Sequence, residues 1–279
     1  MENGKVISFI NMKGGVGKTT LCINIAHTLA AHFGKKVLLV DMDPQFNATQ
    51  SMFTKFSNLN IYSKLRDESK TINGILQPAK GGLASSPTDN NVEDLVIRLF
   101  SQTEGDGHLD MIPGDLEIVN FESSSRGSER ILSSFLKRKL DRKYDYILID
   151  TPATYSIYSQ SALLASDYFL VPVALEAYSA LGYDLLRTAM RNDLALEESD
   201  IIELGIIFTM AKEGKVGRED IEGAFTDHKV FSKKLIEKER IKTGKMATFM
   251  YDMITTKDNI VDITQEFIDE LEGEEHEAI

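Results

Sequence analysis

The segment NMKGGVGKTTLC, which begins at Asn11, restricts the possible folds more than any other part of the chain. It fits the phosphate-loop pattern G-x-x-x-x-G-K-[ST], with Lys13 or its neighbour at the first glycine position. Glycines are needed in such a loop because consecutive backbone N–H groups must turn inward around phosphate oxygens, where a β-carbon would obstruct them. The segment is therefore a variant phosphate loop if a strand precedes it and a helix follows it.

The flanking residues predict that context. Val6 to Ile10 form a short apolar run with β-branched side chains, which is typical of a buried strand. Apolar residues then recur at helical spacing from Leu21 to Ala30, and Gly34 can end this helix. The run KKVLLVD at 35–41 predicts the next buried strand, so the chain begins with a βαβ unit.

The rest of the chain predicts an α/β fold of the P-loop NTPase type. In that fold a mostly parallel central sheet is flanked by helices on both faces. The stretch 78–108 holds most of the turn-forming residues and is expected to be a surface excursion with one short helix at 92–100. Residues 1–263 are expected to form a single domain, followed at 264–279 by an acidic tail that becomes disordered after Leu271. Apolar runs that predict further strands lie at 109–113, 144–150, 167–173 and 204–210.

The side chains after the glycines suit a bound nucleoside triphosphate with Mg²⁺. Lys18 would reach the β- and γ-phosphates, and the Thr19 hydroxyl would bind Mg²⁺. The helix that begins near Lys18 adds its positive end to the same site. The alternative is an ordinary glycine turn with two solvated lysines, which the agreement of strand, helix and Lys-Thr pair disfavours.

Aspartates follow two of the predicted strands. VLLVDMDPQ places Asp41 and Asp43 just beyond one strand, and YILIDTPA places Asp150 at the end of another. This is the sheet edge at which α/β proteins bind ligands. Asp150 has the apolar strand and terminal acid of a Walker B element, which holds Mg²⁺ directly or through water. An aspartate after a strand is often only a cap or turn residue, but two such positions beside a phosphate loop favour a functional site.

Four segments resemble the ParA/Soj family of partition ATPases in order and separation: KGGVGKTT, DMDPQFNAT, YDYILIDTPA and FTM. This family is a branch of the deviant Walker ATPases, which include MinD and the nitrogenase iron protein. Weaker matches at LDMIPGDLEI and ASDYFLVPVALEAYSALGYDLL extend the resemblance from about residue 5 to 212. Residues 1–263 would then form one deviant Walker P-loop ATPase domain.

The resemblance implies a sandwich homodimer that forms with ATP. In it Lys13 would cross the interface to the nucleotide of the other protomer and act like an arginine finger supplied in trans. Asp43 would orient the attacking water, Thr20 would assist phosphate binding, and Thr209 and Met210 would lie near the base. The resemblance thus implies catalytic roles for Lys13, Lys18 and Asp43, Mg²⁺ ligation by Thr19 and Asp150, and ATP binding by Gly14, Gly15, Val16, Gly17, Lys18, Thr19, Thr20, Thr209 and Met210.

The sequence also departs from the family pattern. Phe46 stands where the family usually has glycine, and Ala153 replaces the second proline of its usual D-x-P-P. The segment after Met210 barely matches. The base contacts and the DNA surface are therefore less well defined by the resemblance than the phosphate site.

Other branches of the superfamily are disfavoured. A MinD-like chain would end in a basic amphipathic helix for the membrane, whereas this chain has eight acids and no Lys or Arg from Asp262 onward. Cys22 is the only cysteine, so the chain cannot supply the ligands of an iron–sulfur cluster. No apolar run is long enough for a membrane span, no signal region starts the chain, and no helix-turn-helix precedes the loop. We expect a cytoplasmic protein of the short ParA form, without membrane binding.

DNA would have to be bound by a local patch, because the chain has a net charge of −12. The densest basic stretch is KVFSKKLIEKERIKTGK at 229–245. A solvated helix face with pairs such as Lys233–Glu237 is the alternative interpretation and stays open. The expected DNA contacts are Lys233, Lys234, Lys238, Arg240, Lys242 and Lys245.

The hypothesis from sequence is a weak, Mg²⁺-dependent ATPase whose ATP-bound homodimer binds nucleoid DNA without sequence preference. A ParB-like centromere-binding adaptor would stimulate hydrolysis, and the protein would move plasmid or chromosomal DNA. Two alternatives stay open: a positioning ATPase for a protein cargo, such as a microcompartment or a chemoreceptor array, and a metabolic or regulatory P-loop enzyme that never touches DNA.

Overall fold

A seven-stranded sheet forms the centre of the computed structural model, which describes residues 4–57, 59–76, 92–140, 142–176, 178–211, 219–237 and 249–277. The strand order is β3-β4-β2-β5-β1-β6-β7, and all neighbours are parallel except β3 and β4. The predicted α/β fold with a mostly parallel sheet is confirmed. The strands are β1 (Lys5–Phe9), β2 (Lys36–Asp41), β3 (Ile97–Ser101), β4 (His108–Ile112), β5 (Tyr146–Asp150), β6 (Tyr168–Ala174) and β7 (Ile202–Thr209).

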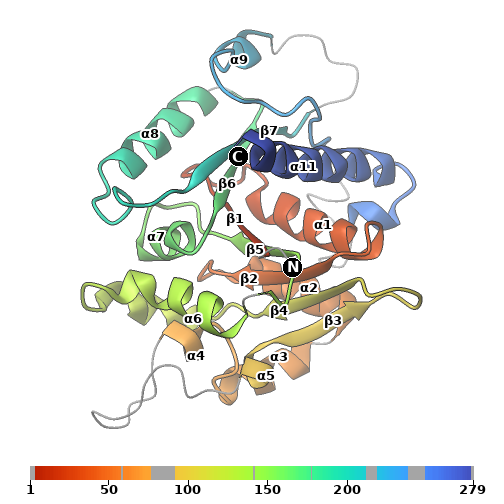
Figure 1. The fold of residues 1–279 in the computed structure, drawn as a ribbon, viewed down its shortest axis with the longest axis vertical. Coiled ribbons are helices and arrows are strands. Elements are labelled where there is room, and N and C mark those ends of the chain that lie inside the picture. Colours follow the sequence, from red (N-terminus) through yellow and green to blue (C-terminus); the bar gives the residue numbers. More distant parts are fainter. Residues whose placement is uncertain are drawn as a thin grey trace.

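Helices cover both faces of this sheet (Figure 1). Helices α1 and α11 lie on one face, and α6, α7 and α8 lie on the other. The α-helices are α1 (Lys18–Ala31), α2 (Asn47–Phe56), α3 (Leu59–Asp67), α4 (Asn73–Leu76), α5 (Val92–Leu95), α6 (Ile131–Lys139), α7 (Ile157–Leu164), α8 (Ser179–Arg191), α9 (Glu219–Gly223) and α11 (Lys257–Glu277). The 3₁₀ turns are η1 (Leu116–Ser123), η2 (Ser128–Arg130) and η3 (Met250–Asp252).

The alternation of side chains along a strand explains why both faces are apolar. In β2, Val37 and Leu39 point to the α1 side, whereas Leu38 and Val40 point to the α6 side. All four are fully buried. Strand β2 therefore reads as a continuous apolar run, as expected for a parallel strand covered on both faces.

One strand was missed by the sequence interpretation. The predicted helix at 92–100 is wrong beyond α5, because residues 97–101 form β3 and pair antiparallel with β4 at the sheet edge. An edge strand has only one covered side, and Arg98 points to solvent while Leu99 is buried. The earlier part of the predicted excursion, residues 77–91, lies outside the described residues.

The predicted domain boundary after residue 263 is also wrong. Helix α11 continues through that position to Glu277. Its residues Phe267 and Leu271 are fully buried, and the Phe267 ring stacks on Phe9 of β1 with centroids 6.5 Å apart. The apolar side chains recur at helical spacing from Ile260 to Leu271, so this face packs on the core while the acids point outward. No helix in the described part of the chain combines the length and the apolar character needed to cross a membrane.

A buried histidine joins α1 to the segment after α9. His27 is 3% exposed, and its Nδ1 atom has no hydrogen-bond partner within the described structure. Burial lowers the pKa of His27 to about 4, while Asp252 raises it and Lys55 lowers it by smaller amounts. The imidazole is therefore neutral near pH 7. The rings around it, all with centroids within 5.7 Å and edge-on, are Phe56, Phe100, Phe249 and Tyr251.

Protein stability is expected to fall as the pH drops from about 6.5 to about 4 because of His27. In this window the unfolded chain binds a proton at His27 and the folded chain does not, so the unfolding free energy loses roughly 3 kcal/mol by its lower end. Above 6.5 this contribution is complete. The unfolding free energy, measured by denaturant unfolding at several pH values, should change less with pH for His27→Phe than for the parent. An equal pH dependence of the unfolding free energy in the two proteins would contradict the assignment to His27.

Candidate functional site

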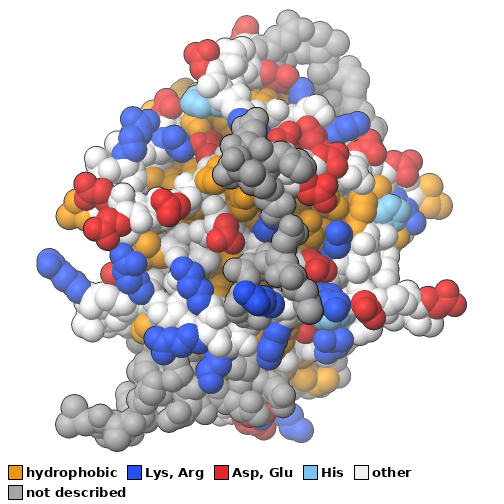
Figure 2. Space-filling view, viewed as in Figure 1, with side chains coloured by type: hydrophobic (Ala, Val, Ile, Leu, Met, Phe, Trp, Pro, Cys, Tyr) orange, Lys and Arg blue, Asp and Glu red, His pale blue; other side chains and the backbone are white. Residues whose placement is uncertain are grey.

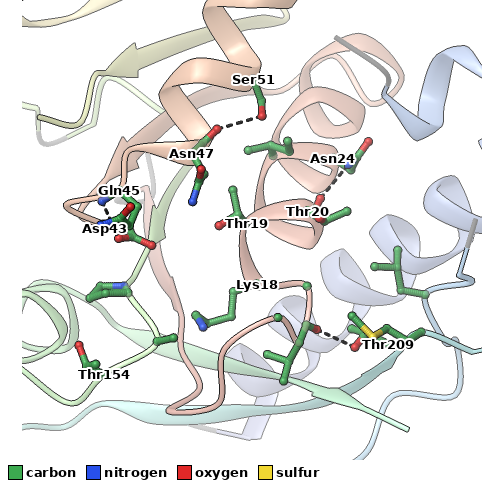
Figure 3. A pocket seen from close by; sticks show the side chains of 18 of the residues that line it. Lys18, Thr19, Thr20, Asn24, Asp43, Gln45, Asn47, Ser51, Thr154 and Thr209 are labelled. Atoms are coloured by element: carbon green, nitrogen blue, oxygen red, sulfur yellow. Dashed lines mark hydrogen bonds between the residues drawn. The ribbon is translucent and has the colours of Figure 1, made fainter. Parts of the chain in front are cut away.

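A cavity of about 920 Å³ opens at the carboxyl edge of the sheet. Parallel strands deliver their following loops to this edge, which is where ligands bind in open α/β sheets. Figure 3 shows Lys18 and Thr19 of α1 in the middle, with Asp43 approaching from one side and Thr209 from the other. The walls come from the loops after β1, β2 and β5, the end of β7, and residues 235–237.

The phosphate-loop glycines adopt the conformations that the motif requires. Gly15 and Gly17 have φ values of 73° and 86°, in the left-handed region that favours glycine. A β-carbon at Gly15 would meet no atom within 4 Å, so its backbone conformation, not crowding, calls for glycine there. Gly17 is the residue before α1, so the amino end of that helix opens into the cavity. Gly14 precedes these residues, and Val16 lines the cavity between them.

Lys18 lies at the start of α1 and is only 7% exposed. Its Nζ atom donates a long hydrogen bond of 3.4 Å to the backbone oxygen of Lys13. Burial lowers the pKa of Lys18, and the nearby carboxylates of Asp150 and Asp43 oppose this effect. The ammonium group is thus held within the loop by a weak contact, from which it can turn toward an anion in the cavity.

The structure brings the two predicted magnesium ligands together. Thr19 Oγ1 donates a hydrogen bond of 2.7 Å to Asp150 Oδ2. The other carboxylate oxygen, Oδ1, is buried without a partner among the described residues. Burial raises the pKa of Asp150, and Asp41 adds to the effect. A hydroxyl beside a carboxylate with one unpaired oxygen is a suitable start for Mg²⁺, which binds few protein oxygens and completes its shell with phosphate and water.

The two aspartates after β2 have different surroundings. Asp41 is fully buried, and its Oδ2 accepts hydrogen bonds from Thr49 N and Thr49 Oγ1 at 2.9 and 2.7 Å. Burial raises its pKa to about 7. Asp43 is half-buried, lines the cavity, and accepts a hydrogen bond of 2.9 Å from Gln45 N. Asp41 therefore fixes the first turn of α2, whereas Asp43 faces the space that a ligand would fill.

Both departures from the family pattern have a local explanation. Phe46 has a left-handed φ of 43°, a conformation that suits the glycine usual at this position. Its ring stacks on Tyr62 with centroids 5.6 Å apart, a contact that offsets the strain. Ala153 lies in the cavity wall. A β-carbon added to Gly14 would lie 3.8 Å from the β-carbon of Ala153. The phosphate loop and the loop after β5 therefore approach closely.

The far wall of the cavity combines Thr209 and Met210, which the family resemblance implied, with three residues that it did not imply. Thr209 Oγ1 donates a hydrogen bond of 2.7 Å to Val16 O, so the end of β7 is tied to the phosphate loop. Met210 follows with a φ of 55°. Leu235, Ile236 and Glu237 complete this wall from a segment without any recognisable motif. A parallel bridge between Ile236 and Ala211 and a hydrogen bond of 2.8 Å from Leu235 N to Phe208 O help to place it there.

Thr20 connects the site to the turn η3 through its backbone oxygen and the side chain of Asn24. The Thr20 oxygen accepts a hydrogen bond of 2.7 Å from Asn24 Nδ2. The other amide atom, Asn24 Oδ1, accepts one of 2.7 Å from Met250 N. Asn24 is 1% exposed, so this side chain links the first turn of α1 to η3 within the core.

Lys13 lies at the rim of the site rather than inside it. Its Nζ atom forms an ion pair of 2.9 Å with Glu176 Oε1, just after β6. The Lys13 side chain is 31% exposed and that of Glu176 is 48% exposed. Gly182 of α8 lies next to the stem of Lys13. Glu176 was missed by the sequence interpretation because nothing in its spacing marks it as a partner of Lys13.

The basic stretch 229–245 is described only in part. Residues 229–237 are not helical, so the predicted pair Lys233–Glu237 does not form there as a helical contact. Instead Lys233 pairs with Asp262 at 3.0 Å and Lys234 pairs with Glu222 at 2.6 Å. Lys229 pairs with Glu270 and Glu274. The remaining expected DNA contacts, Lys238, Arg240, Lys242 and Lys245, lie outside the described residues.

Comparison with known proteins finds relatives across nearly the whole chain. Residues 4–199 match the family model described as an AAA domain. The sporulation initiation inhibitor protein Soj of Bacillus subtilis is 32% identical over 209 residues, covering 74% of this chain and 73% of Soj. The virulence plasmid ParA family protein pGP5-D of Chlamydia psittaci is 27% identical over 288 residues, covering 97% of each chain.

Solved structures show the same fold. A Borrelia burgdorferi protein assigned to plasmid partition, bound to AMPPNP, superposes with a TM-score of 0.74 and 25% identity, covering 97% of this chain and 99% of that one. Cobyrinic acid a,c-diamide synthase of Mycobacterium smegmatis, with an ATP analogue and magnesium, gives a TM-score of 0.73 at 20% identity. That match covers 94% of this chain and 93% of the synthase.

Proposed function

Because this chain belongs to the ParA/Soj family of partition ATPases, we propose that it hydrolyses ATP with Mg²⁺ and partitions plasmid or chromosomal DNA. The observation that carries the proposal is the convergence of Lys18, the Thr19–Asp150 pair and Asp43 on one cavity. Its relatives include Soj and a chlamydial ParA family protein, and a solved relative holds AMPPNP.

Each part of the cavity has a role in this proposal. The backbone of the phosphate loop and Lys18 bind the phosphates, while Thr19 and Asp150 hold Mg²⁺, with Asp150 binding directly or through water. Magnesium, when bound, neutralises charge that develops on the phosphates during transfer. Asp43 orients the attacking water, because it is the aspartate that faces the cavity. Thr209, Met210 and residues 235–237 form the wall against which the base packs.

The ATP-bound state is proposed to be a homodimer in which Lys13 contacts the nucleotide of the partner. The ion pair with Glu176 holds Lys13 at the rim in the single chain, so this pair must open when the dimer forms. An exposed ion pair contributes at most about 1 kcal/mol, so phosphate charge in the dimer can displace it. Glu176 would thereby delay dimerisation until nucleotide is bound.

We further propose that the ATP-bound dimer binds DNA without sequence preference and is reset by a ParB-like centromere-binding adaptor that stimulates slow hydrolysis. The protein would then lie in the cytoplasm, associated with the nucleoid. Two protomers in one dimer present two copies of every DNA contact, so weak contacts add through effective concentration.

Binding to unrelated DNA duplexes is expected to require ATP and Mg²⁺ and to weaken steeply with salt. The reason is that each phosphate contact releases counterions, with a log–log slope of about −0.9 per contact. The measurement is a titration of the protein with ATP, with ADP and without nucleotide, at several salt concentrations. Absence of binding under every condition would leave an ATPase that acts without DNA.

A further inference from the structure

Basic side chains gather along helix α6 and the turns at its two ends. Figure 2 shows Lys and Arg side chains collected over the α6 region of this face, whereas Asp and Glu predominate toward α11. Between residues 126 and 145 the sequence has seven basic residues against three acidic ones, although the whole chain has a net charge of −12. The α6 basic face consists of Arg126, Arg130, Lys137, Arg138, Lys139, Arg142 and Lys143.

The packing of α6 forces these side chains outward. Leu132, Phe135 and Leu136 are buried against the sheet, in the same apolar cluster as Leu38 and Ile147. The opposite side of the helix must therefore face solvent. All seven basic residues are exposed except Lys139, which is half-buried.

Helix stability alone does not account for this cluster. Basic residues in the last turn of a helix interact well with its negative end, which explains Lys137, Arg138 and Lys139. Arg126 and Arg130 precede the helix, where the helix dipole disfavours positive charge. The cluster thus extends beyond the positions that a structural role would need.

The cations of the α6 basic face are also less compensated than those of the 229–245 stretch. In the part of 229–245 that is described, Lys229, Lys233 and Lys234 each pair with a carboxylate. By contrast, Arg130, Lys137 and Lys143 form no ion pair with any described acidic residue, and the same holds for Arg126 and Arg138. A cation that is not already paired releases more free energy when it meets a phosphate, because no internal pair has to break.

We propose that the α6 basic face binds the phosphate backbone of duplex DNA. This inference rests on the proposed DNA binding and assigns it to a surface other than residues 229–245. A solvated polyanion fits better than a membrane, because no described residue from 126 to 143 is an exposed large hydrophobic side chain that could insert into lipid. Four of the seven residues are arginines, whose planar guanidinium groups suit bidentate contacts with phosphate oxygens.

The position of the face is compatible with nucleotide binding. Lys143 lies just before the amino end of β5, whereas Asp150 at the carboxyl end of the same strand accepts a hydrogen bond from Thr19, which lines the cavity. The two ends of a five-residue strand are roughly 13 Å apart. DNA bound at the Lys143 end would therefore leave the opening of the cavity accessible.

The test compares three variants of the full chain as ATP-loaded protein. The face variant is Lys137→Ala/Arg138→Ala/Lys143→Ala. The matched control, Lys64→Ala/Arg66→Ala/Arg191→Ala, removes the same charge from other exposed positions. The third variant is Lys233→Ala/Lys234→Ala. Each is titrated with two unrelated duplexes of equal length at several salt concentrations, and with vesicles of phosphatidylglycerol.

The face variant should lose DNA affinity by on the order of tenfold or more on both duplexes, with a salt slope flatter by about 2 to 3. The control should bind nearly as the parent does, and all variants should bind a fluorescent ATP analogue equally. If the parent binds DNA and the face variant binds equally well, or the control loses as much, the assignment to α6 is overturned while the proposed function stands. A loss confined to vesicles would overturn it in favour of a membrane. If the parent itself binds no duplex at any salt concentration, DNA binding in the proposed function fails and the α6 assignment fails with it.

Discussion

Lys18→Ala is expected to reduce ATP turnover by a factor of about 10³ or more, with the fold preserved. Lys18 is the one buried ammonium at the cavity among the residues described, and it lies beside Asp150 and Asp43. Without it, the negative charge of these carboxylates would repel the phosphates, and the charge that develops in phosphoryl transfer would lose one of the cations that neutralise it. The measurement is phosphate release under saturating ATP, with thermal unfolding as the control for folding.

A matched variant separates charge from packing. Lys18→Met keeps the apolar stem in its buried position and removes only the ammonium group, so it should lose ATP turnover as Lys18→Ala does. Lys64→Ala removes an exposed lysine of α3 and should leave turnover unchanged. Normal turnover in a folded Lys18→Met protein would refute the assignment of the phosphate site.

Lys13→Ala and Asp43→Ala are expected to fail at different steps. Lys13 lies at the rim, so its loss should prevent the stable ATP dimer. Asp43 faces the cavity without contacting the phosphate loop through any described hydrogen bond, so Asp43→Ala should bind ATP and form a dimer that persists because hydrolysis is lost. Turnover should fall by about 10² or more in both variants.

Light scattering with ATP distinguishes these outcomes from a general loss of binding. Glu176→Gln is the companion variant, because it removes the ion pair and keeps Lys13. It should dimerise at a lower ATP concentration than the parent. Two monomeric variants, or two normal dimers with normal turnover, would contradict the separate roles of Lys13 and Asp43.

The parts of the fold that sequence predicted well are those where one physical signal dominates. Strands β1, β2 and β5 are buried on both sides, so continuous apolar runs such as VLLV and YILI identified them. Strand β3 is half-exposed at an edge, and its short segment IRLFS lacks such a run. For α11, the prediction of an acidic tail relied on the number of acidic residues and neglected the helical spacing of Ile260, Phe267 and Leu271. The periodicity of apolar residues is the better guide there, because these side chains are buried in a helix.

The candidate site likewise contains residues that local sequence patterns predicted and residues that they did not. Gly15 to Thr19 and Asp43 follow local patterns and line one cavity, and Asp150 lies beside it through its hydrogen bond from Thr19. Glu176 and residues 235–237 reach the site through tertiary packing across the sheet edge. No local pattern encodes such contacts, because they depend on how β6, β7 and the following segment lie beside the phosphate loop.

The burial of β1 and α1 beneath α11 has a consequence for biosynthesis. The Lys5 ammonium donates a hydrogen bond of 2.7 Å to the oxygen of Leu271, and Phe9 stacks on Phe267. The Lys5–Leu271 contact joins residues 266 positions apart, so it closes a long loop and is expected to form slowly. A ribosome must therefore translate past Leu271 before β1 and the helix that carries Lys18 can be covered. The nascent chain would expose this apolar face throughout its elongation, so chaperones are expected to engage it before the ATPase is complete.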